Sequence, residues 1–162
     1  MQALLRDAVS CTISIEKEGF PFIHVAFFVY DEEQHEIIFH FSKYGYAADQ
    51  ITGGKKAAIS VYRYGKLYSA EKAVDFGCEY QSVVLYGNIT IINDEAERMH
   101  SMQKFFQKFF LNPSHAYEPF TSAQAKPIHV AKVKIADWFG KEHLVPDFAK
   151  ESFYFPVSPV IE

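Results

Sequence analysis

The feature that most constrains this chain is a strict alternation of apolar and polar residues close to its N-terminus. From Val9 to Glu16 every second residue is apolar, and the residues between them carry a hydroxyl group or a charge. A period of two residues belongs to a β-strand that buries one of its faces. The segment therefore predicts a half-buried strand.

Two more strand segments follow after short turns. Residues 17–19 form a Lys-Glu-Gly turn, which leads into the strongly apolar stretch from Pro21 to Tyr30. A polar turn at 31–35 is followed by a third strand, from Glu36 to Phe41. Three consecutive strands joined by short turns indicate an antiparallel meander.

A short helix and a fourth strand are expected next. Tyr44 to Thr52 predicts a helix, which Gly53 and Gly54 end because glycine readily adopts the left-handed conformation of a helix terminus. Ala57 to Tyr64 alternates again and predicts a strand. Residues 65–77 are polar and irregular, so they predict a loop that could hold one helical turn.

A long strand and a long helix come after this loop. Glu79 to Ile92 predicts a fifth strand, in which Gly87 marks a bend or a bulge. Asn93 or Asp94 would cap a helix that runs to about Leu111. The helix carries an apolar stripe at helical spacing, which predicts packing in the core or in a dimer rather than a cofactor site. The members of the stripe are Met99, Met102, Phe106 and Phe109.

The last part of the chain adds one strand and a tail. Residues 115–126 predict a loop, and Ile128 to Ala136 alternates as a sixth strand. The tail, about 145–162, has three prolines and several aromatic residues, which predict an extended segment on a surface, either of this chain or of a partner subunit. Six or more strands with one short and one long helix predict a mainly β (α+β) fold, a small closed barrel. A length of 162 residues fits a single domain.

Charge and composition exclude several function classes. A net charge of −4 gives no electrostatic basis for binding nucleic acid. The longest apolar run, at 20–30, is too short to cross a membrane, which takes about 20 residues. The N-terminus lacks the features of a signal peptide, so we expect a cytoplasmic protein with Cys11 and Cys78 as reduced thiols. No spacing of cysteine, histidine or carboxylate residues predicts a metal site.

The stretch from Ile37 to Tyr46 is the first candidate for a binding site. It reads as a strand that runs into a polar turn and then into a helix, with His40, Ser42 and Lys43 close together. Free backbone N–H groups and the helix dipole make such a junction favourable for anions. The pattern therefore predicts either a phosphate site or an ordinary solvated turn.

Four stretches of the chain, in this order, resemble motifs of the flavin-binding split-barrel proteins related to pyridoxamine 5′-phosphate oxidase. They are EGFPFIHVAFFVYD at 18–31, FHFSKYGY at 39–46, EYQSVVLYGNITIINDEAE at 79–97 and VKIADWFGKE at 133–142. The resemblance is strongest to the branch that contains the 5-nitroimidazole resistance (Nim) proteins. It implies an antiparallel split β-barrel, a homodimer, and FMN, or alternatively FAD, bound in grooves at the subunit interface.

The resemblance also implies which residues hold the flavin. The phosphate end would lie against the turn after the third strand and against the fifth strand, while the isoalloxazine ring would lie along the second strand. Two further residues would reach in from the partner chain. The residues so implied are His24, Val25, Ala26 and Phe27 for the ring; His40, Ser42, Lys43, Gly45, Tyr46, Tyr80 and Ser82 for the phosphate end, with Phe41 and Val83 beside them; and Trp138 and Lys141 from the partner.

Two positions depart from the motifs of the family. The lysine that ends the family's third-strand motif is Ala47 here, so Lys43 or Lys55 would have to supply the cation. The proline of the family's second strand is replaced by Val25 or Ala26.

His40 is the candidate catalytic residue. The resemblance places the matching histidine close to the flavin, where an imidazole could donate a proton or a hydrogen bond to a substrate, although a structural role in the turn remains open. His24 could be a core histidine or line the pocket. Ser82 is expected to bind phosphate rather than act as a nucleophile, because no histidine–acid pair is spaced near it. The histidines expected to be exposed and without a role are His35, His100, His115, His129 and His143.

The resemblance implies a flavin-dependent oxidoreductase, reduced by a nicotinamide or another donor and reoxidised by a small planar acceptor. A non-catalytic flavin carrier or sensor is the first alternative, which Ala47 favours. Haem binding, with His24 or His40 as an axial ligand, is the second.

Overall fold

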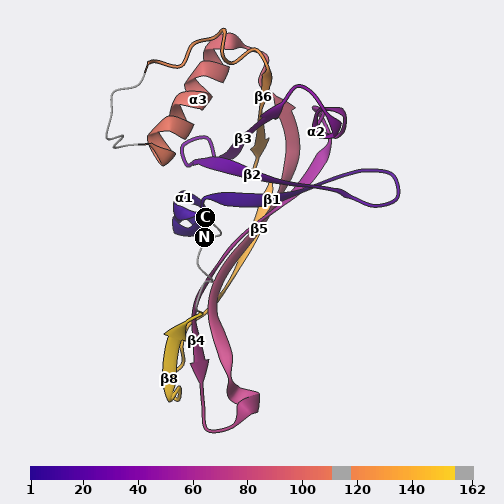
Figure 1. Cartoon of the computed structure of the whole chain (residues 1–162). Helices are drawn as coiled ribbons and strands as arrows, with labels where there is room; N and C mark the ends of the chain where they lie inside the picture. The colour runs from indigo at the N-terminus through magenta and orange to yellow at the C-terminus, as the bar shows by residue number, and fades with distance from the viewer. Residues whose placement is uncertain (111–117, 156–162) are drawn as a thin grey trace.

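The computed structural model describes residues 1–110 and 118–155, and in them eight antiparallel strands form one sheet (Figure 1). The strands are β1 (Ser10–Ile15), β2 (Phe22–Asp31), β3 (Glu36–Ser42), β4 (Lys56–Ser69), β5 (Gly77–Ile91), β6 (Ile128–Lys134), β7 (Asp137–His143) and β8 (Glu151–Tyr154). The helices are α1 (Gln2–Asp7), α2 (Tyr46–Gln50) and α3 (Glu95–Phe109), and Ala73–Asp75 forms a 3₁₀ turn.

Six of the strands close into a ring. The order β5-β6-β3-β2-β1-β4 returns to its start because β4 also pairs with β5. The two other strands, β7 and β8, lie outside the ring, β7 on β5 and β8 on β4. A closed ring with such extensions is a split β-barrel, so the predicted mainly β fold is confirmed.

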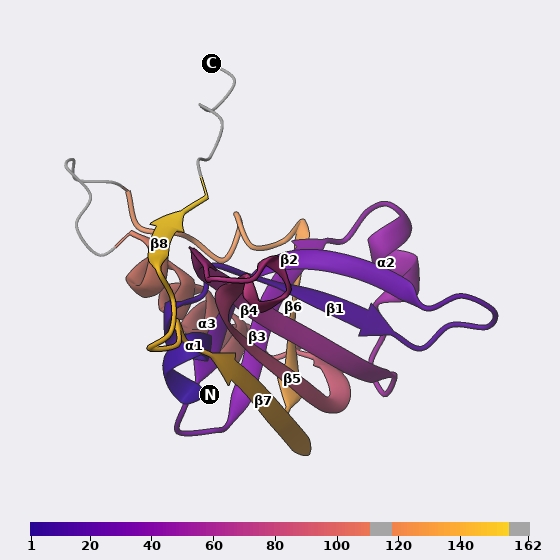
Figure 2. The same cartoon turned by 90° about the horizontal axis from the view of Figure 1, so that it is seen from below.

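The β4–β5 hairpin projects beyond the ring as an arm, which we define as residues 62–82 together with β8. In Figure 1 the arm descends from the barrel, and Figure 2 shows β7 and β8 diverging on either side of it. Only the first part of β4, Ala57 to Ser60, pairs with β1, whereas the β4–β5 ladder runs on to the pair Tyr68 and Gly77.

The main core fills the inside of the ring. The inward residues of β1 are Cys11, Ile13 and Ile15, all at most 3% exposed, as the alternation predicts. Phe28 and Phe39, a directly opposite pair on β2 and β3, are fully buried in the same core. Leu4 and Leu5 of α1 also join this core.

Helix α3 covers only half of the outside of the barrel. Met102 and Phe105 pack on Val29, Ile38 and Val130, which are the outward residues of β2, β3 and β6. Asp94 caps the helix by accepting a hydrogen bond from the Glu97 N–H at 2.8 Å, as expected of an N-cap. Ion pairs of Lys104 with Asp31 and of Lys132 with Glu97 fasten the helix to the strands. Among residues 1–110 and 118–155, no helix covers the outward face of β1, β4, β5 and the first half of β2.

Residues 65–77 of the arm were predicted as a loop, and this prediction is wrong for 65–69 and for Gly77. β4 continues to Ser69 and β5 begins at Gly77, so the loop is shorter, at 70–76, and contains the predicted helical turn as the 3₁₀ turn at Ala73–Asp75. On both faces of the arm most side chains are half-buried or exposed, so the segment lacks the alternation that identifies a strand with one buried face.

Two smaller predictions, on Gly87 and on the short helix, also need correction. The register is continuous through Gly87, and the β4–β5 irregularity lies instead between Tyr64 and Leu67. Gly87 is a close-contact position, because a Cβ there would lie 2.7 Å from Val133 Cγ1 and would also clash with the Lys134 carbonyl. The short helix was predicted from Tyr44 to Thr52, whereas α2 has only five residues, Tyr46–Gln50. The tail forms β8 on its own chain's β4, while residues 111–117 and 156–162 lie outside the described part.

Candidate functional site

The half of the barrel that α3 leaves bare continues onto the arm as one surface, which we call the uncovered face. Its residues follow from the register, because residues directly opposite each other in paired strands point to the same side. One row across it runs Val25, Thr12, Ser60, Val84 and Phe139. The other rows are Ile23, Ser14, Ala58, Tyr86 and Asp137; Phe27 with Ser10; Tyr62, Ser82 and Lys141; and Tyr64, Tyr80 and His143.

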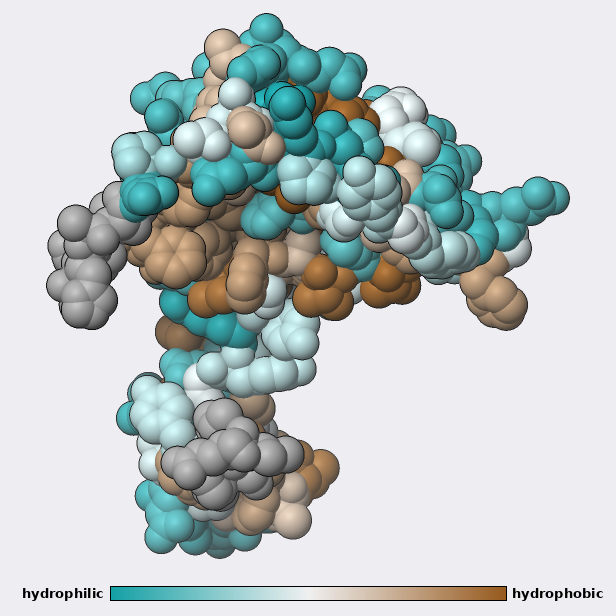
Figure 3. Space-filling view, turned by 45° about the horizontal axis from the view of Figure 1, so that its top comes forward, coloured by the Kyte–Doolittle hydropathy of each residue, from teal (hydrophilic) through white to brown (hydrophobic). Residues whose placement is uncertain are grey.

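The uncovered face has apolar margins and a hydroxyl-lined middle. On β2, Ile23, Val25 and Phe27 are 53%, 65% and 58% exposed, and Phe27 lies at the border with α3, where its ring centroid is 5.5 Å from that of Phe109. On the opposite margin, Tyr86 and Phe139 are also exposed. Hydrophobic side chains are visible along the lower margin of the barrel, where the arm leaves it (Figure 3). A large apolar area of this kind is typical of an interaction or ligand-binding surface.

The structure brings five of the predicted site residues together on this face. They are Val25, Phe27, Tyr80, Ser82 and Lys141. Ser82 and Lys141 are directly opposite each other on β5 and β7, so a hydroxyl-bearing and an ammonium-bearing side chain leave the sheet side by side there. Such a pair can hold an anion.

Ser82, Val83 and Lys141 also line a cleft of about 300 Å³ between β5, β7 and the start of α1. Val83 itself points into the core and is 1% exposed. Met1 closes one side of the cleft, because a Cβ at Gly140 would lie 2.7 Å from Met1 Cγ. The cleft therefore adjoins the uncovered face at the Ser82 row.

Several residues of the face were not predicted from the sequence. Tyr62 and Tyr64 are 57% and 72% exposed, and their ring centroids are 5.4 Å apart. Ser60 and Thr12 supply hydroxyl groups between these rings and β2. The alternation of β1 and β4 could have indicated these residues as outward, but only the register shows that they share a surface with Ser82.

The predicted phosphate turn lies at another place, at the end of β3. The Lys43 N–H donates to the Pro127 carbonyl at 2.9 Å, and the Tyr44 N–H donates to Ser42 Oγ at 3.0 Å, so two backbone donors are already engaged. α2 is a single turn, and Gly45 at its N-cap provides no side-chain hydrogen bond. The helix dipole therefore contributes less here than the sequence suggested.

A cation that the sequence did not indicate is close to this turn. Lys17, from the β1–β2 turn, donates from Nζ to the Tyr46 hydroxyl, and its Nζ lies 5.0 Å from the centroid of that ring. Ala47, at the position of the family's lysine, packs against the main core. Lys17 thus places a positive charge near the turn that lacks the expected lysine.

His40 lies away from the uncovered face, beneath α3. Its ring packs edge-on against Phe105, with centroids 4.8 Å apart, and its Nδ1 is buried without a partner among the described residues. Burial lowers the pKa of His40. The neighbouring residues Phe39 and Phe41 point the other way, into the barrel. The geometry is that of a packed histidine, and its catalytic role stays a prediction.

His24 lies at the mouth of the barrel, facing inward with Ala26 rather than outward with Val25. Its ring stacks on Phe22 at 6.2 Å and meets Phe41 edge-on at 6.3 Å, and burial lowers its pKa. His129 lies 5.3 Å from Phe41 on the same side. Burial and then the nearby charges of Lys43 and Arg98 lower the pKa of His129, so this histidine is neither exposed nor isolated, contrary to expectation.

Two other histidines also differ from expectation, and Trp138, whose role toward a partner chain stays a prediction, contacts one of them. Trp138 packs on its own chain's core and meets His35 edge-on at 4.8 Å. His35 in turn contacts the Tyr30 hydroxyl at 2.9 Å through Nδ1. His143 contacts the Tyr68 hydroxyl at 2.7 Å through Nε2. Both were expected to be exposed and without a role, and both are held in place by ring contacts.

Within residues 1–110 and 118–155, no group of three or more His, Cys, Asp or Glu side chains is arranged to hold a metal ion. In the same part of the chain, no helix combines the length and apolar character needed to cross a membrane. Cys11 and Cys78 are free cysteines without a disulfide bond, and burial raises the pKa of Cys11 to about 12.

Comparisons with known proteins agree with this fold. The structure is similar to the flavocytochrome Anf3 from Azotobacter vinelandii, with a TM-score of 0.78 and 20% identity over 99% of this chain and 79% of the other. An FAD and haem binding protein from Mycobacterium smegmatis also gives a TM-score of 0.78, with 18% identity over 98% of this chain and 85% of the other. A candidate 5-nitroimidazole antibiotic resistance protein from Bacteroides thetaiotaomicron gives 0.68, with 15% identity over 86% of this chain and 80% of the other.

Among curated proteins, none matches the chain. The family model described as pyridoxamine 5′-phosphate oxidase matches residues 1–142, which include the ring, the arm hairpin, α3 and nearly all of β7. The split-barrel topology and this match lead to the same assignment. The chain therefore belongs to the pyridoxamine 5′-phosphate oxidase family.

Proposed function

We propose that this protein binds a flavin between two copies of the chain and acts as a flavin-dependent oxidoreductase. The observation that carries the proposal is the uncovered face. It joins exposed apolar residues of β2, such as Val25 and Phe27, to the hydroxyl and ammonium groups of Ser82 and Lys141. A flat apolar ring with a charged phosphate tail needs these two kinds of surface side by side.

The donor set of the chain fits a phosphorylated flavin. Ser82 and Lys141 offer one hydroxyl and one cation on the uncovered face. Lys17, Lys43 and Ser42 offer a second group at the end of β3. In a dimer, one copy would supply the first group and its partner the second, so each phosphate would meet donors from both chains.

A second copy of this chain is the occupant that best suits the rest of the uncovered face. Ile23, Val25, Phe27, Tyr62 and Phe139 are all between 47% and 65% exposed in the single chain. Burying such residues stabilises an interface by about 25 cal/mol for each Å² of apolar area removed from water. The arm, which projects from the barrel, would lengthen the interface.

The flavin, when bound, would supply hydride and single-electron chemistry between a nicotinamide or other donor and a small planar acceptor. The residues of the chain would bind and orient it and exclude water. FMN is the first choice of cofactor. FAD is the alternative, and it is supported by the similar protein from M. smegmatis, which is described as binding FAD.

Two other functions have specific support. A flavin carrier or sensor is favoured by Ala47, because a missing cation would weaken the hold on the phosphate. Haem binding is favoured by the same two relatives, one of which is a flavocytochrome and the other a haem binding protein. The partly buried His24, at the mouth of the barrel, is the described histidine that we would test first as an axial ligand.

The test is a titration of the purified protein with FMN, FAD and haemin, followed by absorbance and thermal unfolding. We expect a flavin spectrum and a raised midpoint of unfolding with one of the two flavins. A Soret band with no flavin binding would replace the proposal by the haem alternative. Anaerobic bleaching by a nicotinamide cofactor, followed by reoxidation with a nitroaromatic compound, would separate an enzyme from a carrier.

A further inference from the structure

The end of the uncovered face that lies farthest from the arm contains a hollow of about 470 Å³. Its floor includes Ser14 on β1 and Ala58 on β4, which are directly opposite each other. Tyr86 on β5, the next residue of the same row, forms one wall, and Pro21 lines the hollow on the side of β2. Ligand pockets usually have volumes of about 300–1,000 Å³, so this hollow is large enough for a small molecule.

The wall and the floor of the hollow suit a flat ring. The Tyr86 ring packs on Phe139, with centroids 6.3 Å apart, and the Tyr86 carbonyl accepts from the Ala136 N–H at 2.9 Å, so the wall is held in place. The strands β1, β4 and β5 are neighbours at spacings of about 4.8 Å, which makes the floor about 10 Å wide from Ser14 to Tyr86. This width matches one aromatic ring with a substituent, lying beside an aromatic side chain.

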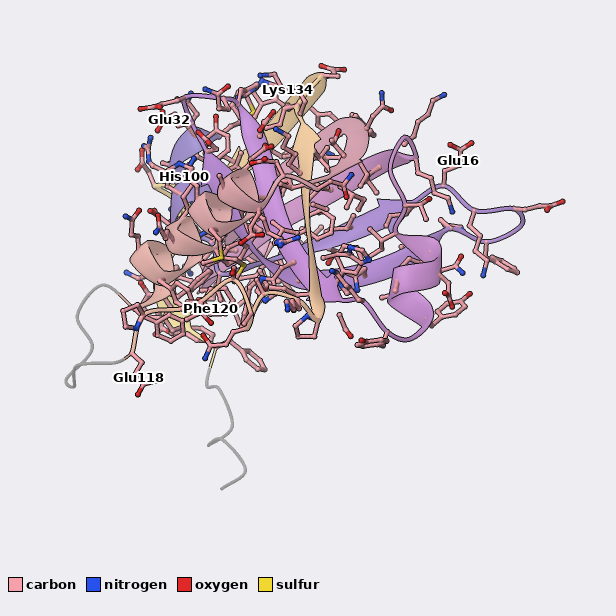
Figure 4. The ribbon with its side chains drawn as sticks, turned by 90° about the horizontal axis from the view of Figure 1, so that it is seen from above. Glu16, Glu32, His100, Glu118, Phe120 and Lys134 are labelled. Atoms are coloured by element: carbon pink, nitrogen blue, oxygen red, sulfur yellow. The ribbon has the colours of Figure 1, made fainter. Side chains whose placement is uncertain are left out.

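The hollow ends in a polar group of three side chains. Lys56 on β4 and Asn88 on β5 are directly opposite each other, one row beyond Ala58 and Tyr86. The Glu16 N–H donates to the Lys56 carbonyl at 3.1 Å, and Glu16 lies at the end of the barrel away from α3 (Figure 4). All three are exposed, and within residues 1–110 and 118–155 their side chains form no hydrogen bond or ion pair.

These three side chains favour a neutral ligand that both donates and accepts hydrogen bonds. A carboxylate on the ring would be attracted by Lys56 but repelled by Glu16, and a cationic group would meet the reverse. An amide group can use all three, because its carbonyl accepts from Lys56 or Asn88 and its NH₂ group donates to Glu16. The hollow therefore combines a place for a flat ring with groups that recognise an amide attached to that ring.

The hollow borders the part of β2 on which the flavin ring is expected to lie. Ser14 is directly opposite Ile23, which points to the same side of the sheet as Val25. A ligand in the hollow would therefore lie beside the flavin ring of the proposed function. Among biological electron donors, the nicotinamide cofactors carry a flat ring with a carboxamide group.

We propose that this hollow binds the nicotinamide ring of the electron donor. The ring lies above Ser14 and Ala58, and its carboxamide contacts Glu16, Lys56 and Asn88. Ala58 determines the specificity, because a larger side chain at this position would occupy the space of the ring. The inference rests on the proposed function, since the donor is needed only if the protein is a flavin-dependent oxidoreductase.

The first test measures ligand binding to the flavin-free protein by protein NMR. The probes are nicotinamide and nicotinate, which has the same ring with a carboxylate in place of the amide. Nicotinamide should shift the signals of Ser14 and Ala58 and should bind about tenfold more tightly than nicotinate. Glu16→Gln removes the group that repels nicotinate, so this preference should disappear. Unshifted signals in the wild type, or an unchanged preference in Glu16→Gln, would overturn the proposal.

The second test fills the hollow. Ala58→Leu should lower the affinity for nicotinamide, NADH and NADPH at least about tenfold, because the longer side chain takes the place of the ring. Ala96→Leu, at an exposed alanine in the first turn of α3, is the matched control and should bind as the wild type does. Unchanged affinities in Ala58→Leu would overturn the proposal. Binding of nicotinamide without binding of either dinucleotide would overturn the assignment to the electron donor.

Flavin titration, light scattering and thermal unfolding are measured for the wild type and for each variant. A wild type that binds no flavin would overturn the proposed function and the assignment to an electron donor with it. A wild type that binds flavin but no nicotinamide compound would overturn this inference alone. A folded Ala58→Leu protein that is monomeric where the wild type is a dimer would assign the hollow to the dimer interface, and would also overturn the inference.

Discussion

The Nζ atom of Lys108 lies 4.2 Å from the centroid of the Phe28 ring. The same atom donates to the Phe28 carbonyl at 3.0 Å and to the Ala8 carbonyl at 2.6 Å. One side chain of α3 thus joins the helix to β2 and to the C-terminal end of α1. Burial is the main cause that lowers the pKa of Lys108 to about 8, against the smaller opposing effects of Cys11 and Asp7.

This contact predicts a stability that rises with pH. An unfolded lysine has a pKa of about 10.4, so between about pH 8 and 10 the unfolded chain binds a proton that the folded chain has already released. The free energy of unfolding therefore rises across this window, by about 1 kcal/mol after allowance for partial exposure. Urea unfolding of Lys108→Met should lack this rise, while Lys134→Met, on the exposed end of β6, should keep it. Equal pH dependence in the wild type and Lys108→Met would contradict the assignment.

Gly87→Ala should destabilise the fold by about 1–3 kcal/mol, because the new methyl group would press on Val133 and on the Lys134 carbonyl. Gly53→Ala is the matched control, since its Cβ would have no neighbour closer than 3.9 Å. Chemical unfolding measures both. Similar stabilities for the two variants would show that β5 and β6 separate easily at this point.

Val25→Asp should convert the proposed dimer to a monomer without unfolding it. Val25 is 65% exposed in the single chain, so a carboxylate there costs little until a second copy covers it. Light scattering at micromolar concentration measures the change. His100→Asp, at an exposed residue of α3 on the other side of the barrel (Figure 4), should leave the dimer intact. A wild type that is already monomeric would count against binding between two copies.

Ser82→Ala should weaken flavin binding by about 1–3 kcal/mol, because it removes a hydroxyl from a charged phosphate. Fluorescence titration with FMN and FAD measures the affinity. Thr90→Ala, at an exposed hydroxyl further along β5, is the control. Unchanged affinity in Ser82→Ala would remove this residue from the site.

Lys17→Met should also weaken flavin binding, by about 1–2 kcal/mol, if the end of β3 holds the phosphate. The lysine contacts Tyr46 and would supply the positive charge missing at Ala47. The sequence suggested Lys55 as another source of this charge, and Lys55→Met tests that suggestion. A larger effect of Lys55→Met than of Lys17→Met would reverse the roles of the two lysines.

The strands of the ring were largely predictable, because each buries one face and shows it in the sequence. Val9 to Glu16 is the clearest case, and the structure places β1 there. The alternation of β3 also predicts that His40 points to the opposite face from Phe39 and Phe41. It does not show that the far side of β3 is covered by α3, which depends on contacts between residues more than fifty positions apart.

The candidate site was predictable only in part, because it depends on register and on side chains distant in sequence. Ser82 and Lys141 are 59 positions apart and meet only through the β5–β7 ladder. Lys17 reaches Tyr46 across 29 positions. Tyr68 and His143 are 75 positions apart, and nothing local distinguishes His143 from an exposed histidine.

β5 forms ladders with β4, β6 and β7, so it belongs both to the ring and to the arm. From Tyr80 to Tyr86 it has a partner on each side, and its backbone amides there should be among the slowest in the molecule to exchange with deuterium. Tyr80 and Ser82 thus lie in the part of the backbone that we expect to be the most rigid. A ligand that binds to these residues would meet preorganised contacts, so little of its free energy of binding would be lost to ordering the chain.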